Sequence, residues 1–326
     1  MIELLEQLVN IPSVSGYERD VGQFLVDYLK KCSFSVFRQA VDGDRFNVIA
    51  TTGATPRVLF CTHMDTVAPY FPYKQQGDTC FGRGVCDAKG QIVTMLAAGE
   101  RLRKSGIDNF CFLFVVDEEN VSAGAKKAAE LDVNSSYVII GEPTENKLVV
   151  AQKGILVYRI SATGTGGHSS QPERGRSAIH ELIQFLQTWI KKDWGKSSDF
   201  GHSLVNVGRI SGGSGNNVLA HEATAEGIFR IATSLSDIHN RMQPIPDNIK
   251  VEILSEYEPQ RFLKLPDFET TTVGFGTDAA YLRSLGDMLL LGPGSIHHAH
   301  RLDEQITTQE LEKAVTLYVE MVKRLV

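Results

Sequence analysis

The sequence of 326 residues predicts an α/β fold, in which a mostly parallel mixed sheet has helices on both faces and is interrupted by an inserted α+β domain. Two observations favour this fold. In the first half, short β-rich runs alternate with amphipathic helical segments, which is typical of a parallel sheet covered on both faces. Near residue 150 this alternation stops, and it returns only after Pro259.

The first half supplies most of the predicted main sheet. Helical periodicity occurs in residues 2–10, 18–32, 89–106 and 122–132. Runs rich in β-branched and aromatic residues lie at 57–63, 109–117 and 135–143. Ligands of such sheets bind outside the carboxyl ends of the strands. The residues that follow each run are therefore the first candidates for function.

A second domain is predicted over residues 153–258, so that residues 1–152 and 259–326 form the main α/β domain around it. It opens with one long strand or two strands, which end in the glycine-rich turn GTGG. The later elements are a helix at 175–192, strand-like stretches at 202–213 and 222–233, a short helix at 234–243 and a strand at 248–258. The main sheet then resumes with a strand at 287–294 and a closing helix at 307–326.

The composition argues against several classes of function. The formal net charge is −6 and the pI is about 5.9, whereas proteins that bind nucleic acid without sequence preference carry a basic excess. No polybasic run is present for a membrane surface. The N-terminus lacks the layout of a signal peptide, and no apolar run reaches the roughly 18 residues of a membrane span, so we expect a cytoplasmic protein.

The five cysteines are predicted to be reduced and buried. Their number is odd, none form a C-x-x-C pair, and several lie in apolar strand-like runs. Cys86 is adjacent to Asp87, but it is not favoured as a metal ligand because no second thiol accompanies it.

Acidic and histidine residues lie at or just beyond the ends of the predicted strands. One run ends at His63, two further runs lead into carboxylates, and the last strand leads through a loop to a histidine. An additional aspartate lies in a turn before a helix. The complete set is His63, Asp65, Asp87, Glu118, Glu119, Glu142 and His300.

Each of these residues has a simpler interpretation when it is taken alone. A histidine at a strand end is usually satisfied locally, and Asp87 fits a helix N-cap. The glutamates fit surface charge or a turn, and the three histidines at 297, 298 and 300 fit a solvated loop. Together these interpretations fail, because carboxylates crowded at one sheet edge repel each other unless a cation lies between them.

Carboxylates and two histidines form a nitrogen and oxygen ligand set that suits zinc. Five candidate ligands, one of them shared, make two sites with three protein ligands each and open positions for water. Two ions about 3.5–4 Å apart need a bridging carboxylate, and catalysis needs an unligated carboxylate as general base. The adjacent Glu118 and Glu119 can supply a base and a ligand. Asp65 is predicted to bind the second ring nitrogen of His63.

Seven motifs, in order along the chain, are THMDTV, GRGVCDAKG, DEE, GEPT, GGHSSQPERGRSA, GTDA and GPGSIHHAHRLDE. Over nearly its whole length the chain resembles the co-catalytic zinc aminoacylase/carboxypeptidase family, which includes acetylornithine deacetylase and succinyl-diaminopimelate desuccinylase. This resemblance implies two divalent metal ions, with zinc favoured and cobalt or manganese as alternatives. It also implies that the inserted domain is a lid through which two chains form a homodimer.

The resemblance implies a role for each candidate ligand. His63 and Glu142 would bind one zinc ion, Glu119 and His300 would bind the other, and Asp87 would bridge both. His300 is chosen among the three nearby histidines because the family ligand lies in the Ala-His step of this motif.

Further positions receive roles from the same resemblance. Glu118 would be the general base, Asp65 would orient His63, and the peptide between Asp87 and Ala88 would be cis. In the inserted domain, His168 would stabilise the oxyanion, in its own chain or across the dimer. Arg230 and Asn217 would bind the substrate, although Arg230 also fits a surface strand residue with a local salt bridge.

The implied reaction is the hydrolysis of an Nα-acyl amino acid by a water that two metal ions share. An acetylornithine deacetylase-like enzyme of amino-acid biosynthesis is favoured. The alternatives on the same scaffold are a di- or tripeptidase, a carboxypeptidase and succinyl-diaminopimelate desuccinylase. A non-catalytic binding protein is disfavoured because every ligand is kept. Neither G-x-S-x-G nor G-x-G-x-x-G occurs, which argues against a serine hydrolase and a dehydrogenase.

The chain departs from its relatives in two places. NVLA replaces the more usual NVIP, so that Ala220 lacks a turn proline. Residues 256–274 show no helical period where relatives usually have a helix. We expect this shortening to reshape one wall of the substrate pocket.

Overall fold

The computed structural model describes residues 1–133 and 135–326, which divide into two compact units. Unit 1 comprises Met1–Val150, Phe262–Thr271 and Thr277–Val326. Unit 2 comprises Ala151–Arg261 and Thr272–Gly276, and the predicted inserted domain at 153–258 lies within it. The role of that domain as a lid stays a prediction.

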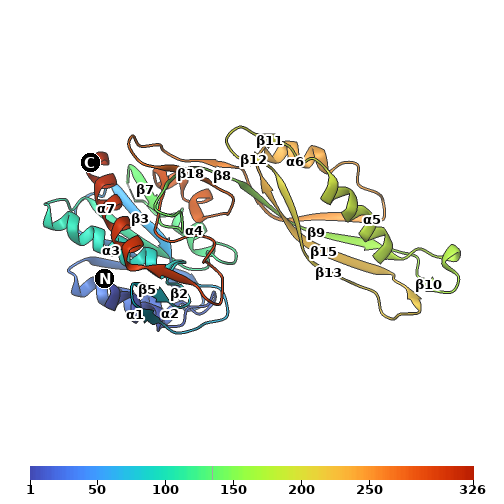
Figure 1. The fold of residues 1–326 in the computed structure, drawn as a ribbon, viewed down its shortest axis with the longest axis horizontal. Helices are drawn as coiled ribbons and strands as arrows, with labels where there is room; N and C mark the ends of the chain where they lie inside the picture. Colours follow the sequence, from blue (N-terminus) through green and yellow to red (C-terminus); the bar gives the residue numbers. More distant parts are fainter. Residues whose placement is uncertain (134) are drawn as a thin grey trace. The chain divides into compact units, whose positions relative to one another are not determined.

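Unit 1 is built on a six-stranded sheet with the order β1-β2-β6-β3-β7-β19 (Figure 1). The pairs β6–β3, β3–β7 and β7–β19 are parallel, whereas β1–β2 and β2–β6 are antiparallel. The strands are β1 (Ser35–Asp42), β2 (Arg45–Thr51), β3 (Val58–His63), β6 (Phe110–Val115), β7 (Tyr137–Ile140) and β19 (Asp287–Leu290). The β1–β2 hairpin is absent from the predicted elements, because β1 is an edge strand with no fully buried position.

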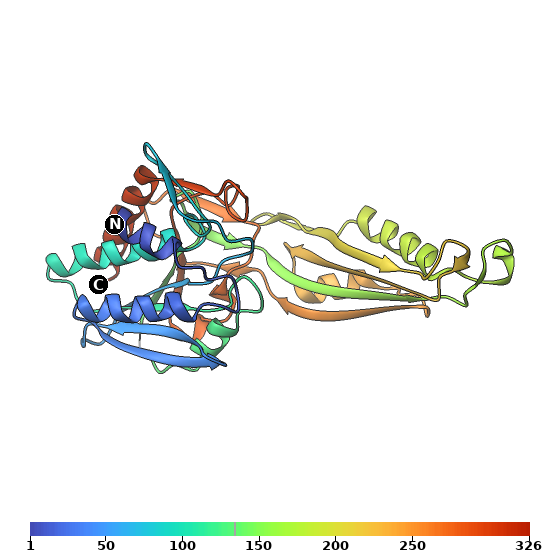
Figure 2. The same ribbon diagram turned by 90° about the horizontal axis from the view of Figure 1, so that it is seen from below.

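Helices cover both faces of this sheet (Figure 2). On one face, apolar side chains of four helices share a core with alternate residues of β6, namely Phe110, Phe112 and Phe114. These helices are α1 (Ile2–Val9), α2 (Arg19–Lys31), α3 (Lys89–Lys104) and α7 (Thr308–Leu325). On the other face lies α4 (Ala123–Ala128), where the Asn47 side chain donates to the Gly124 carbonyl at 2.8 Å. Every position of β3 and β6 is buried, which explains their continuous apolar runs.

Unit 1 and the chain segments that connect it to unit 2 also contain short strands and 3-10 helices. A three-stranded sheet has the order β20-β5-β4. The remaining elements are β4 (Lys74–Gln76), β5 (Thr79–Phe81), β8 (Leu148–Gln152), β17 (Gln260–Arg261), β18 (Thr270–Val273), β20 (Gln305–Thr307), η2 (Asp278–Ala280) and η3 (Arg283–Leu285). Residues 256–274 hold strands and no helix, in agreement with the sequence pattern.

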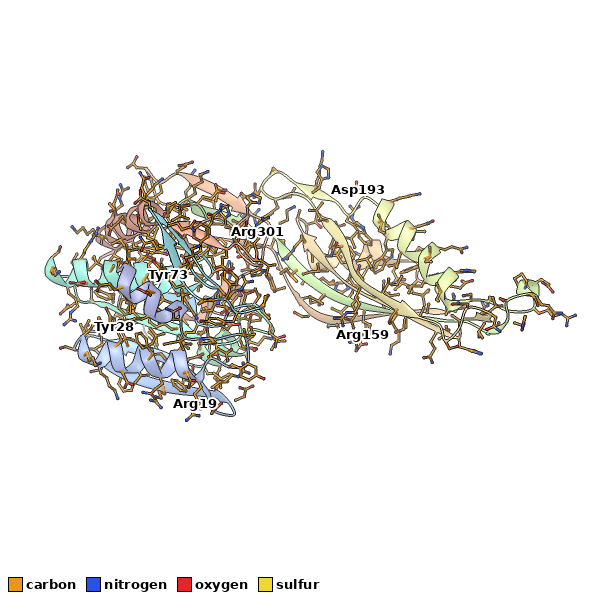
Figure 3. The ribbon with its side chains drawn as sticks, turned by 60° about the horizontal axis from the view of Figure 1, so that its bottom comes forward. Arg19, Tyr28, Tyr73, Arg159, Asp193 and Arg301 are labelled. Atoms are coloured by element: carbon orange, nitrogen blue, oxygen red, sulfur yellow. The ribbon has the colours of Figure 1, made fainter. Side chains whose placement is uncertain are left out.

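Unit 2 contains an antiparallel sheet with the order β13-β15-β9-β16, whose strands are β9 (Gly154–Thr163), β13 (Leu204–Gly212), β15 (Glu222–Ile231) and β16 (Ile249–Tyr257). The helices α5 (Ala178–Lys191) and α6 (Leu235–Met242) bury Trp189 and Ile238 in the same core as Tyr158 and Phe229 of the sheet. On β9, Arg159 bonds to a glutamate of β15 at 2.8 Å (Figure 3). The short elements are β10 (Gly167–His168), η1 (Pro172–Arg174), β11 (Lys196–Ser197), β12 (Gly201–His202) and β14 (Val218–Leu219).

The predicted fold class is therefore confirmed, because a mixed α/β sheet unit accompanies an α+β unit. All five cysteines are free thiols, and four of them are buried. Within residues 1–133 and 135–326, no helix combines the length and apolar character needed to cross a membrane. The cytoplasmic location stays a prediction.

Candidate active site

The site lies in unit 1, where three neighbouring parallel strands end. β3 ends at His63, the turn after β6 carries Glu118 and Glu119, and Glu142 follows β7. Because parallel strands present their carboxyl ends at one sheet edge, residues distant in sequence meet here.

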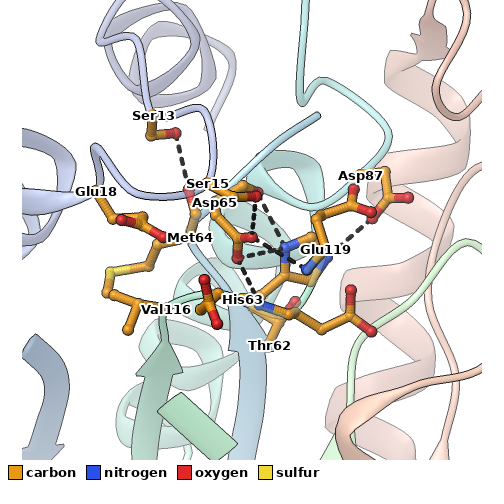
Figure 4. A network of polar contacts seen from close by, with 12 residues as sticks. Ser13, Ser15, Glu18, Thr62, His63, Met64, Asp65, Asp87, Val116 and Glu119 are labelled. Carbon is orange, nitrogen blue, oxygen red and sulfur yellow. Dashed lines mark hydrogen bonds and ion pairs between the residues drawn. The ribbon is translucent and has the colours of Figure 1, made fainter. Parts of the chain in front are cut away.

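Asp87 contacts two histidines of this group, and its contact with His63 is drawn in Figure 4. Its Oδ1 is 3.0 Å from His63 Nε2, and its Oδ2 is 3.5 Å from His300 Nε2. Glu142 Oε2 lies 4.0 Å from the same nitrogen of His63. Glu119 Oε1 lies 2.9 Å from His300 Nε2. The two oxygens of Asp87 therefore face two different histidines, and each histidine has its own glutamate.

The backbone around Asp87 differs from that of an ordinary helix start. Ala88 holds the N-cap position of α3, and no side chain caps the helix, so capping does not account for Asp87. The peptide between Asp87 and Ala88 is cis, as the resemblance implies.

Burial, followed by the charge of neighbouring carboxylates, raises the pKa of both glutamates in the turn after β6. Burial and then the charge of Glu142 raise the pKa of Glu118 well above its usual value. Burial, followed by the charge of Asp87, raises the pKa of Glu119. On the basic side, contacts with Asp87 and Glu119 raise the pKa of His300 to about 10. Negative charge is thus concentrated here, and protons or cations must balance it.

This donor set fits metal ions. One ligand atom each from His63, Asp87 and Glu119 lie within 4.8 Å of one another. Glu142 and His300 extend the group on either side of Asp87. Imidazole and carboxylate donors suit zinc and related divalent ions, which would replace the protons that the crowded carboxylates otherwise attract.

Asp65 makes contacts beyond the predicted one with His63. His63 Nδ1 lies 3.0 Å from the backbone oxygen of Asp65 and 3.4 Å from its Oδ1. The side chain also accepts the backbone N–H groups of Glu118 and Glu119 at 3.0 and 3.1 Å. It also accepts the Ser15 hydroxyl at 2.7 Å. The nearest bond to His63 therefore comes from the main chain, and the Asp65 side chain fixes the turn that carries the two glutamates.

A second group of contacts holds the same turn. Asp117, directly before Glu118, has a left-handed backbone with φ 70°. Its Oδ1 accepts Arg45 Nη1 at 3.0 Å, and the same nitrogen lies 3.2 Å from Glu18 Oε1. Nothing in the sequence pattern singles out Arg45, because its partners lie far from it along the chain.

Two more buried carboxylates near the site are missing from the predicted set. Glu304 is fully buried and binds the loop that leads to Asp87. Asp278 lies in η2, and burial raises its pKa to about 7, although the Ser122 hydroxyl and His63 act in the opposite direction. Within the described residues, neither oxygen of Asp278 has a hydrogen bond of normal length. The motifs GTDA and HHAHRLDE contain both residues, and this was the available signal.

The three candidate residues of unit 2, His168, Asn217 and Arg230, lie at two separate positions in that unit. His168 pairs with Val218 across β10 and β14, and the Ser169 N–H donates to the Asn217 carbonyl at 3.0 Å, so His168 and Asn217 are neighbours. The His168 ring is exposed, and its Nδ1 lies 2.7 Å from Ser170 Oγ.

Arg230 lies near the opposite end of this sheet. It is next to the last residue of β15, whereas the β14 strand beside His168 leads into the start of β15. The extended strand from 222 to 230 has eight residue-to-residue steps and spans about 26 Å. Burial lowers the pKa of the Arg230 guanidinium. The structure therefore brings His168 and Asn217 together and leaves Arg230 apart from them.

The chain belongs to Peptidase family M20/M25/M40, whose sequence profile matches residues 59–324. A Peptidase M20 domain-containing protein of Schizosaccharomyces pombe is 36% identical over 335 residues, which cover 99% of this chain and 84% of the relative. A probable carboxypeptidase of Emericella nidulans is 34% identical over 375 residues, with 98% and 88% covered.

Solved structures share the fold at low sequence identity. A tripeptidase from Staphylococcus aureus superposes with a TM-score of 0.84 at 19% identity, covering 99% of this chain and 97% of its own. The metallo-carboxypeptidase Sso-CP2 from Sulfolobus solfataricus has a TM-score of 0.80 at 16% identity, with 99% and 98% covered.

The family membership defines the class of reaction. The chain is a metal-dependent hydrolase that acts on amide bonds. The resemblance to the aminoacylase/carboxypeptidase family is thereby confirmed at the level of the family. Membership of the acetylornithine deacetylase branch of this family stays a prediction.

Proposed function

We propose that this protein hydrolyses the amide bond next to a C-terminal amino acid, as a carboxypeptidase of short peptides. The observation that carries the proposal is the position of Asp87, whose two oxygens face two different histidines. Such a carboxylate is suited to bridge two metal ions. Several of the similar proteins are named probable carboxypeptidases. This name favours a substrate with a free terminal carboxylate.

In this proposal five residues would hold two divalent ions. His63 and Glu142 would hold one, His300 and Glu119 would hold the other, and Asp87 would be shared. Zinc is the favoured ion, and cobalt or manganese suit the same donors. When bound, the ions would polarise the amide carbonyl and acidify the attacking water.

Glu118 is proposed as the general base. It is adjacent to the ligand Glu119, but the pairing of His300 with Glu119 leaves it outside the closest ligand contacts. Burial raises its pKa, which makes the carboxylate a stronger proton acceptor than an exposed glutamate. Glu118 would take the proton of the attacking water and return it to the leaving amine. The Asp65 side chain holds the backbone of Glu118 in place for this exchange.

The residues of unit 2 are proposed to bind the substrate. His168 and Asn217 would donate hydrogen bonds to the oxyanion and its surroundings, and Arg230 would bind the terminal carboxylate. A strand segment of about 26 Å separates the two groups within one chain, far more than the length of a dipeptide. This separation favours a homodimer in which each substrate meets His168 and Asn217 of one chain and Arg230 of the other.

A second candidate is deacylation of an Nα-acetyl amino acid, with acetylornithine as the leading substrate. The GEPT and GPGSIHHAHRLDE stretches look most like those of the acetylornithine deacetylase branch. Both candidates break an amide whose leaving amine belongs to an amino acid with a free carboxylate. The acyl side of the substrate alone distinguishes them.

The test is a substrate panel with zinc-reconstituted protein, with and without a chelator. The panel contains dipeptides, tripeptides, acetyl-ornithine, succinyl-diaminopimelate and neutral acetyl amino acids. Chelator-sensitive release of C-terminal amino acids from peptides would support the carboxypeptidase. Release of ornithine alone would replace it with the deacetylase. A protein that binds no metal ion would contradict the proposed site itself.

A further inference from the structure

Glu304 is a carboxylate with no exposed surface, in the same segment as His300. It lies 217 residues after Asp87 along the chain, yet it bonds to the backbone of that residue. We propose that Glu304 is a positioning residue, which holds the loop before α3 so that the Asp87 carboxylate faces both histidines. This inference rests on the proposed function, in which Asp87 contacts two metal ions.

The contacts of Glu304 are directed at the main chain of one loop. Its Oε1 accepts the backbone N–H groups of Gly84, Cys86 and Asp87 at 3.0, 3.0 and 3.1 Å. Its Oε2 accepts Arg83 Nη1 at 2.6 Å. A single carboxylate thus accepts from three buried N–H groups and from one nitrogen of a buried guanidinium. Groups of this kind are expensive to leave without a partner, so the loop has little freedom while Glu304 is in place.

The Asp87 side chain itself is held differently. Both of its oxygens contact the imidazoles of His63 and His300, the groups that would share metal ions with it. Its direction also depends on its backbone, and Glu304 holds that backbone at the N–H of the same residue. Loss of this acceptor would remove the bond that fixes the Asp87 N–H and leave a buried donor without a partner.

Glu304 also joins two parts of the site. His300 lies four residues before it, and its ring contacts Asp87 and Glu119. The Gly82 N–H donates to the Glu304 backbone oxygen at 3.3 Å, which adds a main-chain link between the same segments. Glu304 thus links the segment that carries His300 to the loop that carries Asp87.

Asp65 is a counterpart of Glu304 within the site. It accepts the backbone N–H groups of Glu118 and Glu119, whereas Glu304 accepts those around Asp87. The turn with Glu118 and Glu119 and the loop before Asp87 are therefore each organised by a buried carboxylate that contacts main chain.

The test uses Glu304→Gln, which keeps the shape of the side chain but removes its charge and sets an amide N–H₂ against Arg83 or the loop. The probe is Co²⁺ added to the metal-free full chain. We expect its affinity, measured by competition with a chromophoric chelator, to fall by about 10–100-fold, the usual loss when the residues behind metal ligands are changed. The visible absorption spectrum of the bound Co²⁺ should also change. With the most active substrate, kcat should fall more than KM rises.

The matched control is Glu310→Gln. Glu310 is a partly buried carboxylate six residues after Glu304, and it accepts the backbone N–H of Thr307 at 2.8 Å. The N–H groups of Gly84, Cys86 and Asp87 bond to Glu304 and not to Glu310. We expect this variant to keep the Co²⁺ affinity and spectrum of the unchanged protein.

Each outcome has a defined meaning. If Glu304→Gln binds two Co²⁺ ions with unchanged affinity and spectrum, Glu304 is merely structural and the inference is wrong, while the proposed function stands. If the unchanged protein binds no Co²⁺, the proposed function fails and the inference fails with it. If Glu304→Gln does not fold, Glu304→Asp replaces it, because it keeps the charge but is one methylene too short. Unchanged Co²⁺ affinity in that variant would equally overturn the inference.

Discussion

The two units of the molecule hold their candidate functional residues in contrasting ways. In unit 1 the ligand candidates contact one another, and buried carboxylates fix the loops that carry them. In unit 2 His168 is exposed on a two-residue strand, and its ring bonds to the neighbouring Ser170. The proposed metal ligands are therefore organised by contacts within unit 1, whereas the His168 ring, which is proposed to bind substrate, is exposed and bonds to its neighbour Ser170.

The sharpest test of this comparison is the proposed base. We expect Glu118→Ala to lower kcat by up to about 10⁴-fold, because proton transfer by a positioned base contributes about that much at most. The variant should keep both metal ions, since Glu118 is not among the proposed ligands. Turnover and metal content are measured on the same preparation. An active variant would show that the base lies elsewhere.

The exposed histidine should give the next largest effect. We expect His168→Ala to lower kcat by about 10²–10³-fold, the usual loss when one donor to an oxyanion is removed. Metal affinity should not change, because His168 belongs to unit 2.

The two inactive variants also test the division between chains. If each site combines Glu118 of one chain with His168 of the other, a re-equilibrated equal mixture of Glu118→Ala and His168→Ala regains about a quarter of full activity, because half of the random dimers carry one intact site. No recovery, in a mixture shown to exchange subunits, would assign both residues to one chain.

Arg230 should affect substrate affinity more than turnover. We expect Arg230→Ala to raise KM by about 10–100-fold, in line with about 1.5–3 kcal/mol for a hydrogen bond to a charged group. A substrate whose terminal carboxylate is amidated provides the control, because it should not distinguish the variant from the unchanged protein. An equal loss with both substrates would mean that Arg230 serves the sheet and not the substrate.

The smallest expected effect concerns the buried carboxyl group of Asp278 and the pH dependence of the stability of the protein. The pKa of Asp278 is raised to about 7 in the folded chain, so its contribution to stability is present below its unfolded pKa of about 3.8 and is lost as the pH rises through 7. Asp278→Asn should therefore stabilise the metal-free protein at pH 8 by on the order of 2 kcal/mol and have little effect near pH 4. Urea unfolding at the two pH values measures this difference. An equal effect at both values would contradict the assigned cause.

The sequence pattern predicted the parts of the site that follow from strand order. His63, Glu119 and Glu142 could be placed together because each lies at or just beyond the end of a parallel strand. The contacts of Glu304 could not be predicted, because they join a side chain to backbone N–H groups more than two hundred residues away. The β1–β2 hairpin was missed for a local reason, since its partly exposed edge strand has no continuous apolar run.

The Asp65 prediction was correct about the partner and incomplete about the bond. Spacing places Asp65 next to His63, but it does not tell whether the main chain or the side chain makes the contact. The side chain is occupied by the turn that begins after β6, and this competition is visible only in three dimensions. Sequence spacing therefore predicted which residues meet but not which atoms bond.

The late position of Glu304 bears on how the cell completes this protein. During synthesis His63, Asp87, Glu119 and Glu142 leave the ribosome long before residue 304, so a nascent chain carries most of its ligands without the acceptor that holds the Asp87 loop. A metal ion that arrives at this stage meets a set of donors whose shared member is still free to move. The proposed ligand His300 is also made late, so the proposed ligand set and the acceptor of the Asp87 loop are complete only after residue 304 has been synthesised.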